Sequence, residues 1–237
     1  MTQKKSTVEE IRARFDQDVE RFSNLESGQL STIDAAISLE LITEASKRLV
    51  PHATQLLDIG CGAGNYTLKM LQKLPGLTCT LLDLSQPMLE RAAQRVGAAT
   101  TGAVTTVQAD FREAGLPENQ YDIILAGAVL HHLRDDADWE SSFAKLYALL
   151  KKGGCLMISD LVTQDDERLT AYTWERYGDY LEATGGADYR QKVLDYVAKE
   201  DSPRSVTYQL ALMKRLGFRE VEILHKNMCF AAFGGIK

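Results

Sequence analysis

The sequence is poor in cysteine, and its few cysteines lack the pattern of a metal site or a disulfide framework. Four cysteines occur in 237 residues, with no CxxC pair and no histidine at ligand spacing. We therefore expect no metal ligands and no disulfide framework. Cys79, Cys155 and Cys229 fall in expected strands, where a free cysteine acts as a small buried apolar residue. Cys61 lies near a helix start, where a thiol is either an activated nucleophile or, as we favour, a compact filler.

Long apolar runs and clusters of positive charge are also missing. No stretch approaches the ~20 apolar residues that span a bilayer, and the opening MTQKKSTVEE has no apolar core of a signal peptide. Lys and Arg total 27 against 33 Asp and Glu, a net charge of −6, without a basic cluster that would follow phosphates. We expect a cytoplasmic protein without membrane contact and disfavour nucleic acid, leaving open only a small patch dedicated to tRNA.

Strand patterns alternate with helical patterns through the middle of the chain. The expected strands cover 54–59, 78–83, 103–109, 121–126 and 154–162, and the expected helices cover 64–74, 86–97 and 137–151. Such alternation implies right-handed crossovers and a mostly parallel α/β sheet with helices on both faces. Two closing strands, near 218–224 and 227–234, bring the sheet to seven strands.

Helical segments flank this alternating region. Residues 6–24 and 31–50 are expected to be helices that pack on the core, the second through a face of Ile33, Ile37, Leu41, Ala45 and Leu49. The segment 165–200 interrupts the alternation and is expected to be an inserted helical lid. Its Tyr172, Trp174, Tyr177 and Tyr180 either line a pocket or, as we favour, dock the lid on the core together with Leu169 and Leu181.

One more helix is expected after the lid, at 202–216. Ser202 stands at the N-cap position, Pro203 at the first helical position and Gly217 at the C-terminal stop. We expect residues 1–50 to form N-terminal helices and residues 51–237 to form a single domain that carries the lid.

The run Leu56–Tyr66 is the most informative part of the chain. An apolar strand ends in Asp58 and passes into Gly60, Gly62 and Gly64 before helix-forming residues begin. These glycines can adopt positive φ, and the helix start offers free N–H groups to an anion, so the loop predicts a small bound cofactor. The spacing does not fit GxGxxG, and no Gly-Lys-Ser/Thr follows, which disfavours a dinucleotide and a triphosphate.

The strand, acid and loop resemble motif I of the class I S-adenosylmethionine-dependent methyltransferases. The resemblance implies a Rossmann-like fold and S-adenosylmethionine as cofactor. It also implies that Asp58 organises the amino end of the methionine moiety while Gly60, Cys61 and Gly62 pass beside it.

Acids also end the second and third expected strands. Asp83 stands about 20 residues past the loop, where a carboxylate can accept hydrogen bonds from both ribose hydroxyls. The alternative is that Asp83 caps the helix that follows. Leu84 and Met88, just after Asp83, are further candidates for cofactor contact. Asp110 can accept the adenine amino group while Phe111 or Leu84 covers the ring. The same family uses acids at these two places.

The fourth strand leads through Ala126 and Gly127 to His131 and His132, and it resembles the family's strand and turn beside the methyl group. Histidine is the commonest general base near neutral pH, so His131 is a weak catalytic candidate without a visible partner. Its alternative is a solvated or capping imidazole.

A chain-wide similarity points to carboxy-S-adenosylmethionine synthases, which act in tRNA wobble-uridine modification. It rests on Phe15-Asp16, Arg21-Phe22, the DIGC segment, Leu149–Gly154 and the closing Leu216–Phe230. Two positions depart from that family, because its Asn falls at Gly127 and its arginine for the extra carboxylate falls near Leu212. We therefore predict a methyltransferase that acts on a small molecule and forms a homodimer. A synthase-like enzyme and a catalytically silent binding protein are the alternatives.

Overall fold

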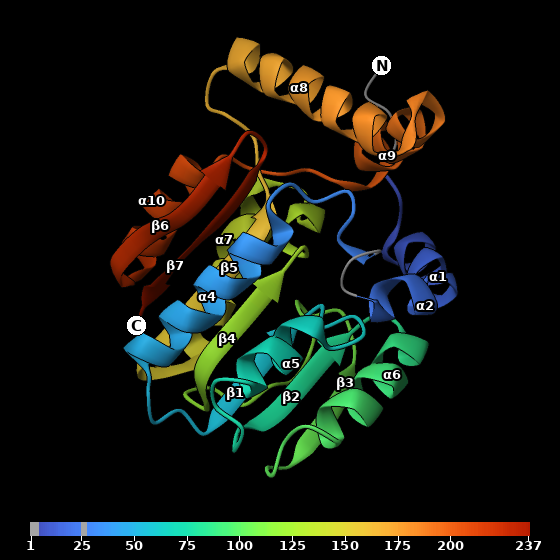
Figure 1. Ribbon diagram of the computed structural model, residues 1–237. Coiled ribbons are helices and arrows are strands. Elements are labelled where there is room, and N and C mark those ends of the chain that lie inside the picture. Colours follow the sequence, from blue (N-terminus) through green and yellow to red (C-terminus); the bar gives the residue numbers. More distant parts are fainter. Residues whose placement is uncertain (1–4, 25–27) are drawn as a thin grey trace.

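A seven-stranded sheet forms the centre of the computed structural model, which describes residues 5–24 and 28–237 (Figure 1). The strands are β1 (Gln55–Ile59), β2 (Thr78–Asp83), β3 (Val104–Gln108), β4 (Tyr121–Gly127), β5 (Leu150–Leu161), β6 (Arg219–Asn227) and β7 (Phe230–Ile236). Their order is β3-β2-β1-β4-β5-β7-β6; β1 to β5 pair in parallel, and β7 runs antiparallel to both of its neighbours. The predicted mostly parallel α/β sheet is confirmed.

Helices cover both faces of this sheet. One core cluster joins the strands to α4 (Ala35–Leu49), α5 (Asn65–Leu71) and α6 (Gln86–Gly97), and the other joins them to α7 (Asp136–Leu149) and α10 (Val206–Leu216). Neighbouring strand residues such as Leu56 and Leu57 enter opposite clusters, as the twofold side-chain period of a strand requires.

The predicted buried face at 31–50 was only partly right, because Ile33 is buried and Ala45 packs on the core but two other members are exposed. Ile37 is 52% exposed and Leu49 is 42% exposed, whereas Leu39, Ile42 and Ser46 are buried against the sheet. Ser46 can be buried because its hydroxyl donates to the carbonyl of Ile42, four residues earlier, at 2.7 Å. Satisfied hydroxyls behave as small core groups, so a count of apolar residues alone misplaces part of the buried face.

The predicted start of α10 was also wrong. Ser205, not Ser202, caps the helix, and its hydroxyl accepts the Tyr208 N–H at 3.1 Å. The segment before Ser205 is held in an extended form because the Ser202 N–H donates to the His131 carbonyl at 2.7 Å. Gly217 ends the helix with φ of 102°, as predicted.

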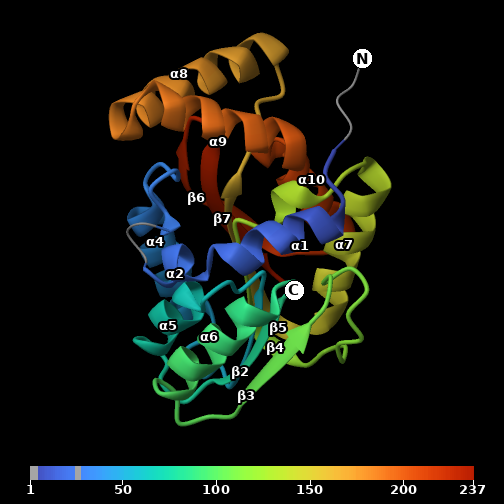
Figure 2. The ribbon, with the colours of Figure 1, turned by 90° about the vertical axis from the view of Figure 1, so that its right-hand side faces the viewer.

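The remaining helices lie above the carboxyl ends of the parallel strands. α1 (Val8–Gln17) and α2 (Val19–Ser23) pass under the lid helices α8 (Glu167–Gly185) and α9 (Ala187–Glu200), as Figures 1 and 2 show. The expected single helix at 6–24 is therefore two helices that meet at Asp18. Among the described residues, no helix combines the length and apolar character needed to cross a membrane.

The lid docks through a narrow stripe of α8. Tyr177 is buried, packs against Phe230 and donates its hydroxyl to the Ser31 carbonyl at 2.9 Å. Leu169 and Tyr172, which the sequence predicted at the docking face, are 57% and 58% exposed. They lie near the start of α8, outside the stretch around Tyr177 where the lid meets the core.

Candidate active site

A cavity of about 390 Å³ opens at the carboxyl edge of the sheet, lined by residues of the parallel strands, α1, α2 and the lid. Most of the predicted cofactor residues line it: Gly60, Cys61, Gly62, Asp83, Leu84, Met88, Asp110, Phe111 and Gly127, together with the catalytic candidate His131. Its volume is within the ~300–1,000 Å³ range of small-ligand sites. The strand order reverses beside it, between β1 and β4, which is the usual binding place in open α/β sheets.

The glycine loop presents bare backbone to this cavity. Gly60, Gly62 and Gly64 all have positive φ, at 62°, 50° and 84°. A Cβ at Gly60 would lie 2.7 Å from Val129, so this glycine is needed for packing. A Cβ at Gly62 would meet no protein atom within 4 Å, so Gly62 keeps open the space that a ligand would enter.

Asp83 lies at the end of β2 and is tied to the glycine loop. Its Oδ2 accepts the Gly62 N–H at 2.8 Å, and its Oδ1 accepts the Ser85 N–H at 2.9 Å. Burial raises the pKa of this carboxyl, although both N–H groups oppose the shift. The cap of α6 is Ser85, whose hydroxyl accepts the Met88 N–H, so the alternative of Asp83 as the helix cap is wrong.

Asp110 and Phe111 lie just beyond β3. Phe111 is 7% exposed and offers an apolar wall. Asp110 forms a bidentate ion pair with Arg112. The Arg112 Nε lies 2.9 Å from Oδ1, and its Nη2 lies 2.5 Å from Oδ2. Burial alone would raise the pKa of Asp110, but Arg112 outweighs it and lowers the pKa. Much of the acceptor capacity of Asp110 is thus already used within the protein.

Two predicted residues, Asp58 and Ala126, do not line the cavity. Ala126 is fully buried in β4. Asp58 is 1% exposed beneath the loop, where its Oδ2 accepts the Thr67 hydroxyl at 2.6 Å and the Thr67 N–H at 3.2 Å. Burial raises the pKa of Asp58 to about 7, against the effect of the Thr67 hydrogen bonds.

None of the cysteines is prepared for chemistry. All four are free and buried. Burial, with Asp83 and Asp58 nearby, raises the pKa of the Cys61 thiol well above its usual value, which removes the basis for an activated nucleophile. Cys229 lies in the turn between β6 and β7 rather than in a strand, because β6 extends only to Asn227.

His131 has partners that the sequence did not reveal. Its Nδ1 contacts the Asp160 carboxylate at the end of β5, and its Nε2 lies 3.7 Å from Asp201 Oδ1. Burial alone would lower its pKa, but the two carboxylates raise it to about 9. An imidazole that already carries its proton at neutral pH is a poor general base, so the free protein does not support that role for His131.

The turn after β4 is closed by an aromatic ring. Gly127 is the last residue of β4, and a Cβ there would lie 2.7 Å from the Tyr66 ring, so a side chain at this position would have to displace the ring. Burial raises the pKa of the Tyr66 phenol to about 12, which keeps it neutral beside Ser159.

The N-terminal helices contribute side chains that the sequence assigned only to core packing. Ile11, Arg14 and Phe15 from α1, with Arg21 and Phe22 from α2, line the cavity. The signal was local, since apolar Ile11, Phe15 and Phe22 follow helical spacing. What the sequence lacked was a sign that this stripe faces the strand ends.

Known proteins resemble this chain in sequence and in fold. A family model described as a methyltransferase domain matches residues 57–156. A carboxy-S-adenosyl-L-methionine synthase of Shewanella sp. (strain W3-18-1) is 25% identical over 206 residues, which cover 84% of this chain and 82% of that protein. An uncharacterized methyltransferase of Mycobacterium bovis is 32% identical over 116 residues, which cover 48% of this chain and only 55% of that relative.

A solved methyltransferase structure has the same fold. The crystal structure of a Burkholderia thailandensis 1,6-didemethyltoxoflavin N1-methyltransferase, with bound 1,6-didemethyltoxoflavin and S-adenosylhomocysteine, matches with a TM-score of 0.60 at 17% identity. The match covers 98% of this chain and 91% of that one. This chain is a class I S-adenosylmethionine-dependent methyltransferase. The fold predicted from the alternating pattern and the cofactor implied by the resemblance of the glycine loop and strand-ending acids are thereby confirmed.

The cavity of the methyltransferase fits S-adenosylmethionine on physical grounds. Buried Asp83 offers carboxylate oxygen to a sugar, Leu84 and Phe111 offer apolar walls to a base, and Gly62 leaves a space that a Cβ would enter.

Proposed function

We propose that this methyltransferase transfers a methyl group from S-adenosylmethionine to a small-molecule acceptor. The best support is that the cavity is covered: residues of α1 and α2, with Tyr177 and Tyr196 of the lid, line it opposite the strand ends. An enclosed site of this volume suits a small acceptor. Arginines do line the cavity, but Arg14, Arg112 and Arg134 are bound to Glu200, to Asp110 and to the Glu200 carbonyl, so they do not form a free basic track for phosphates.

We assign cofactor contacts to the residues that end the strands. In this assignment Asp83 accepts hydrogen bonds from the ribose hydroxyls. Asp110, Phe111 and Leu84 contact the adenine, and Met88 lies beside them. The glycine loop and Asp58 beneath it are to hold the amino-acid end. Gly127, after Ala126, is to lie beside the reactive methyl group. The support is their common position at one edge of the sheet.

The residues of this chain then act by alignment. Bound S-adenosylmethionine supplies a methyl group on a sulfonium, which is already a good leaving group. The loop fixes one reactant, the lid and α1 hold the other, and both exclude water. Orientation of this kind can contribute effective molarities of about 10⁵ M or more, so methyl transfer does not require a general base.

Turnover tests the enzyme assignment. We expect slow formation of S-adenosylhomocysteine when the protein is incubated with S-adenosylmethionine and a mixture of small metabolites, measured by mass spectrometry. A protein that binds the cofactor yet produces no S-adenosylhomocysteine with any acceptor class would be the catalytically silent binder instead.

We expect Asp83→Ala to weaken S-adenosylmethionine binding by about 1.5–3 kcal/mol, the scale for hydrogen bonds to a charged group. The Gly62 N–H also loses its acceptor, which loosens the loop. Asp110→Asn should cost less, because Arg112 already occupies that carboxylate. Calorimetry of both variants measures the difference, and equal affinity for Asp83→Ala and the parent would remove Asp83 from the site.

A synthase-like reaction is the second candidate, favoured by similarity over most of the chain to a carboxy-S-adenosyl-L-methionine synthase. Its extra carboxylate would need a cation, because an unpaired buried charge costs several kcal/mol. Leu212, at the expected arginine position, is 2% exposed in the core. Arg204 pairs with Asp136 at 2.5 Å, and Arg14, which lines the cavity, pairs with Glu200 at 2.6 Å.

We therefore expect S-adenosylmethionine to bind at least about tenfold more tightly than its carboxy derivative, or 1.4 kcal/mol. Competition calorimetry with both ligands measures the ratio. Preference for the carboxy form that disappears in Arg14→Gln but persists in Arg204→Ala would favour the synthase reaction.

We further propose a cytoplasmic homodimer, built from one domain (51–237) with its lid at 165–200 and the N-terminal helices of 1–50. Four free buried thiols suit a reducing compartment. The exposed Leu169 and Tyr172 on α8 offer an apolar contact. Light scattering of the purified chain tests the dimer.

A further inference from the structure

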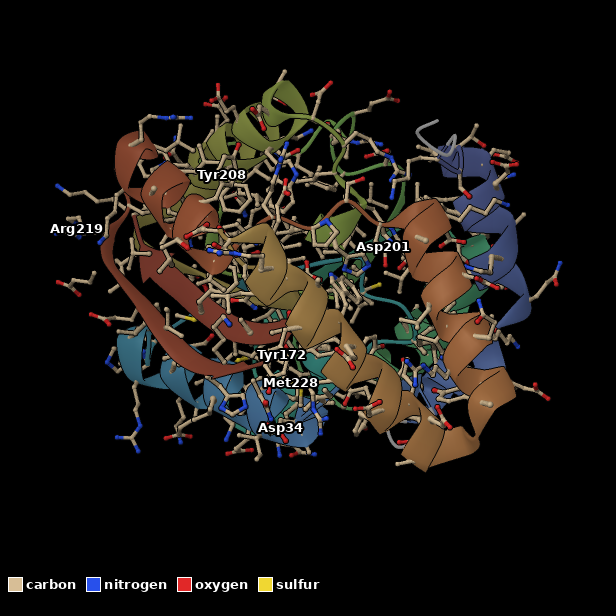
Figure 3. All side chains as sticks on the ribbon, turned by 90° about the horizontal axis from the view of Figure 1, so that it is seen from above. Asp34, Tyr172, Asp201, Tyr208, Arg219 and Met228 are labelled. Atoms are coloured by element: carbon tan, nitrogen blue, oxygen red, sulfur yellow. The ribbon has the colours of Figure 1, made fainter. Side chains whose placement is uncertain are left out.

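Two histidines and an aspartate meet in one corner of the cavity. His131 and His132 form the 3-10 turn after β4, and Asp201 follows α9, some 70 residues later. One ligand atom from each of the three residues lies within 4.8 Å of the others. Figure 3 shows Asp201 in the middle of the molecule, beyond the end of α9, with Arg219 far away at the outer edge.

This corner is largely buried, and several of its polar atoms make no hydrogen bond. The side chains of His131, His132 and Asp201 are 11%, 18% and 3% exposed. His132 Nδ1 lies 3.2 Å from Asp201 Oδ1, but the atoms are not aligned for a hydrogen bond. Within the described residues, neither ring nitrogen of His132 nor Oδ1 of Asp201 has a hydrogen-bond partner. Buried polar atoms usually have partners, so this group calls for a ligand.

Asp160 orients one of the two rings. Its Oδ1 contacts His131 Nδ1, while its Oδ2 accepts the Leu130 N–H at 2.8 Å and the His131 N–H at 3.2 Å. The ring is thus fixed with Nε2 directed towards Asp201, at 3.7 Å from Oδ1. A carboxylate that holds the far nitrogen of a histidine is the usual second partner of a metal-bound imidazole.

We propose that His131 Nε2, His132 and Asp201 bind one divalent transition-metal ion, such as Zn²⁺ or Fe²⁺, inside the cavity. Ligands about 2.1 Å from such an ion lie about 3.4 Å from one another in tetrahedral geometry, so the most widely separated pair of ligand atoms needs to approach by up to about 1.4 Å. Two imidazoles and one carboxylate suit these ions, whereas Mg²⁺ and Ca²⁺ prefer oxygen ligands. The sequence predicted no metal ligands because Asp201 is remote in the chain from the histidine pair.

The charges around the corner match a cation. Asp160 and Asp201 supply two negative charges, which in the free protein hold the proton on His131. A bound cation would take the place of the proton on Nε2. The neighbouring cations are already engaged, since Arg14 pairs with Glu200, Arg134 donates to the carbonyls of Glu200 and Ser6, and Lys5 donates to the carbonyls of Ala198 and Asp201.

Three protein ligands leave at least one coordination position open. Since all three residues line the cavity, that position faces the proposed acceptor site. If the proposed methyl transfer holds, the ion would bind an acceptor oxygen and favour its deprotonated form. This role rests on the proposed function, but metal binding itself does not.

Titration of the full chain without a histidine tag, after dialysis against a chelator, tests the site. We expect one equivalent of Zn²⁺ by calorimetry and one of Co²⁺ by its visible absorption, with no competition from excess Mg²⁺. Asp201→Asn and His132→Gln should each weaken binding by more than about 100-fold, and Asp160→Asn by about 10–100-fold. His52→Gln, at an exposed histidine outside the cavity, is the matched control and should bind as the parent does.

Each outcome decides the proposal without any activity assay. A parent protein that binds less than one equivalent of Co²⁺ and of Zn²⁺ would overturn it, as would unchanged stoichiometry and affinity in folded His132→Gln. Circular dichroism establishes folding, and if Asp201→Asn is unfolded, His132→Gln and Asp160→Asn carry the decision. Loss of methyl transfer with intact metal binding would contradict the proposed function alone.

Discussion

Gly62→Val is expected to abolish S-adenosylmethionine binding while the protein remains folded. The Cβ at this position points into open cavity space, with no protein atom within 4 Å, so the valine would occupy the volume of the ligand. The φ of 50° adds backbone strain of about 1–2 kcal/mol for a residue with a side chain. Calorimetry measures the affinity, and circular dichroism with thermal unfolding measures the fold.

The matched control is Gly153→Val. Gly153 also has positive φ, at 80°, and a Cβ there also meets open space, but it lies at the surface outside the cavity. This variant should lose a similar amount of stability and bind the cofactor normally. Normal binding by folded Gly62→Val, or an equal loss in Gly153→Val, would show that strain or another site governs affinity.

Asp58→Asn is expected to stabilise the ligand-free protein above pH 7 while it weakens cofactor binding. The native carboxyl has a pKa of about 7 because of burial, compared with 3.8 for the ordinary group. Between these values the native state holds more protons than the unfolded state. The free energy of unfolding therefore falls as the pH rises from about 4 to 7, by up to about 4 kcal/mol, and then levels off. Asparagine has no charge to bury and removes this fall.

Urea unfolding at pH 4 and pH 8 measures the effect. The two proteins should agree most closely at pH 4, and Asp58→Asn should be the more stable at pH 8. Its affinity for S-adenosylmethionine should fall, because the amino group of the methionine moiety would lose the attraction of the negative charge that Asp58 carries beneath the glycine loop. Lower stability of Asp58→Asn at pH 8 would mean that the charged carboxylate is already stabilised in the free protein. Burial also raises the pKa of Asp83, so part of the pH dependence of stability remains in both proteins.

The sequence predicted the elements around the cofactor loop closely. The bounds of β2 and α6 agree with the predicted 78–83 and 86–97. Their signals are local: an apolar strand ends in an acid, Ser85 caps the helix and Pro87 stands near its start. Local signals persist in the fold because the side chains and backbone groups involved are a few residues apart.

The carboxyl-edge acids were placed for the same reason. Parallel strands joined by right-handed crossovers bring their carboxyl ends to one edge, so Asp83, Asp110 and the glycine loop meet whatever their separation in sequence. The alternating pattern alone was enough to predict that edge.

Tertiary structure decided what the local pattern left open. It buried Ser46 and exposed Ile37 on α4, and it delayed the start of α10 to Val206. It also brought Asp201 to the histidine pair and turned the stripe of α1 towards the strand ends. These contacts join residues that are distant in the chain, so their energy depends on how whole elements pack. No short window of sequence contains the information on how whole elements pack. Strand periodicity, helix caps and glycine turns, in contrast, depend on residues that are close together in the chain.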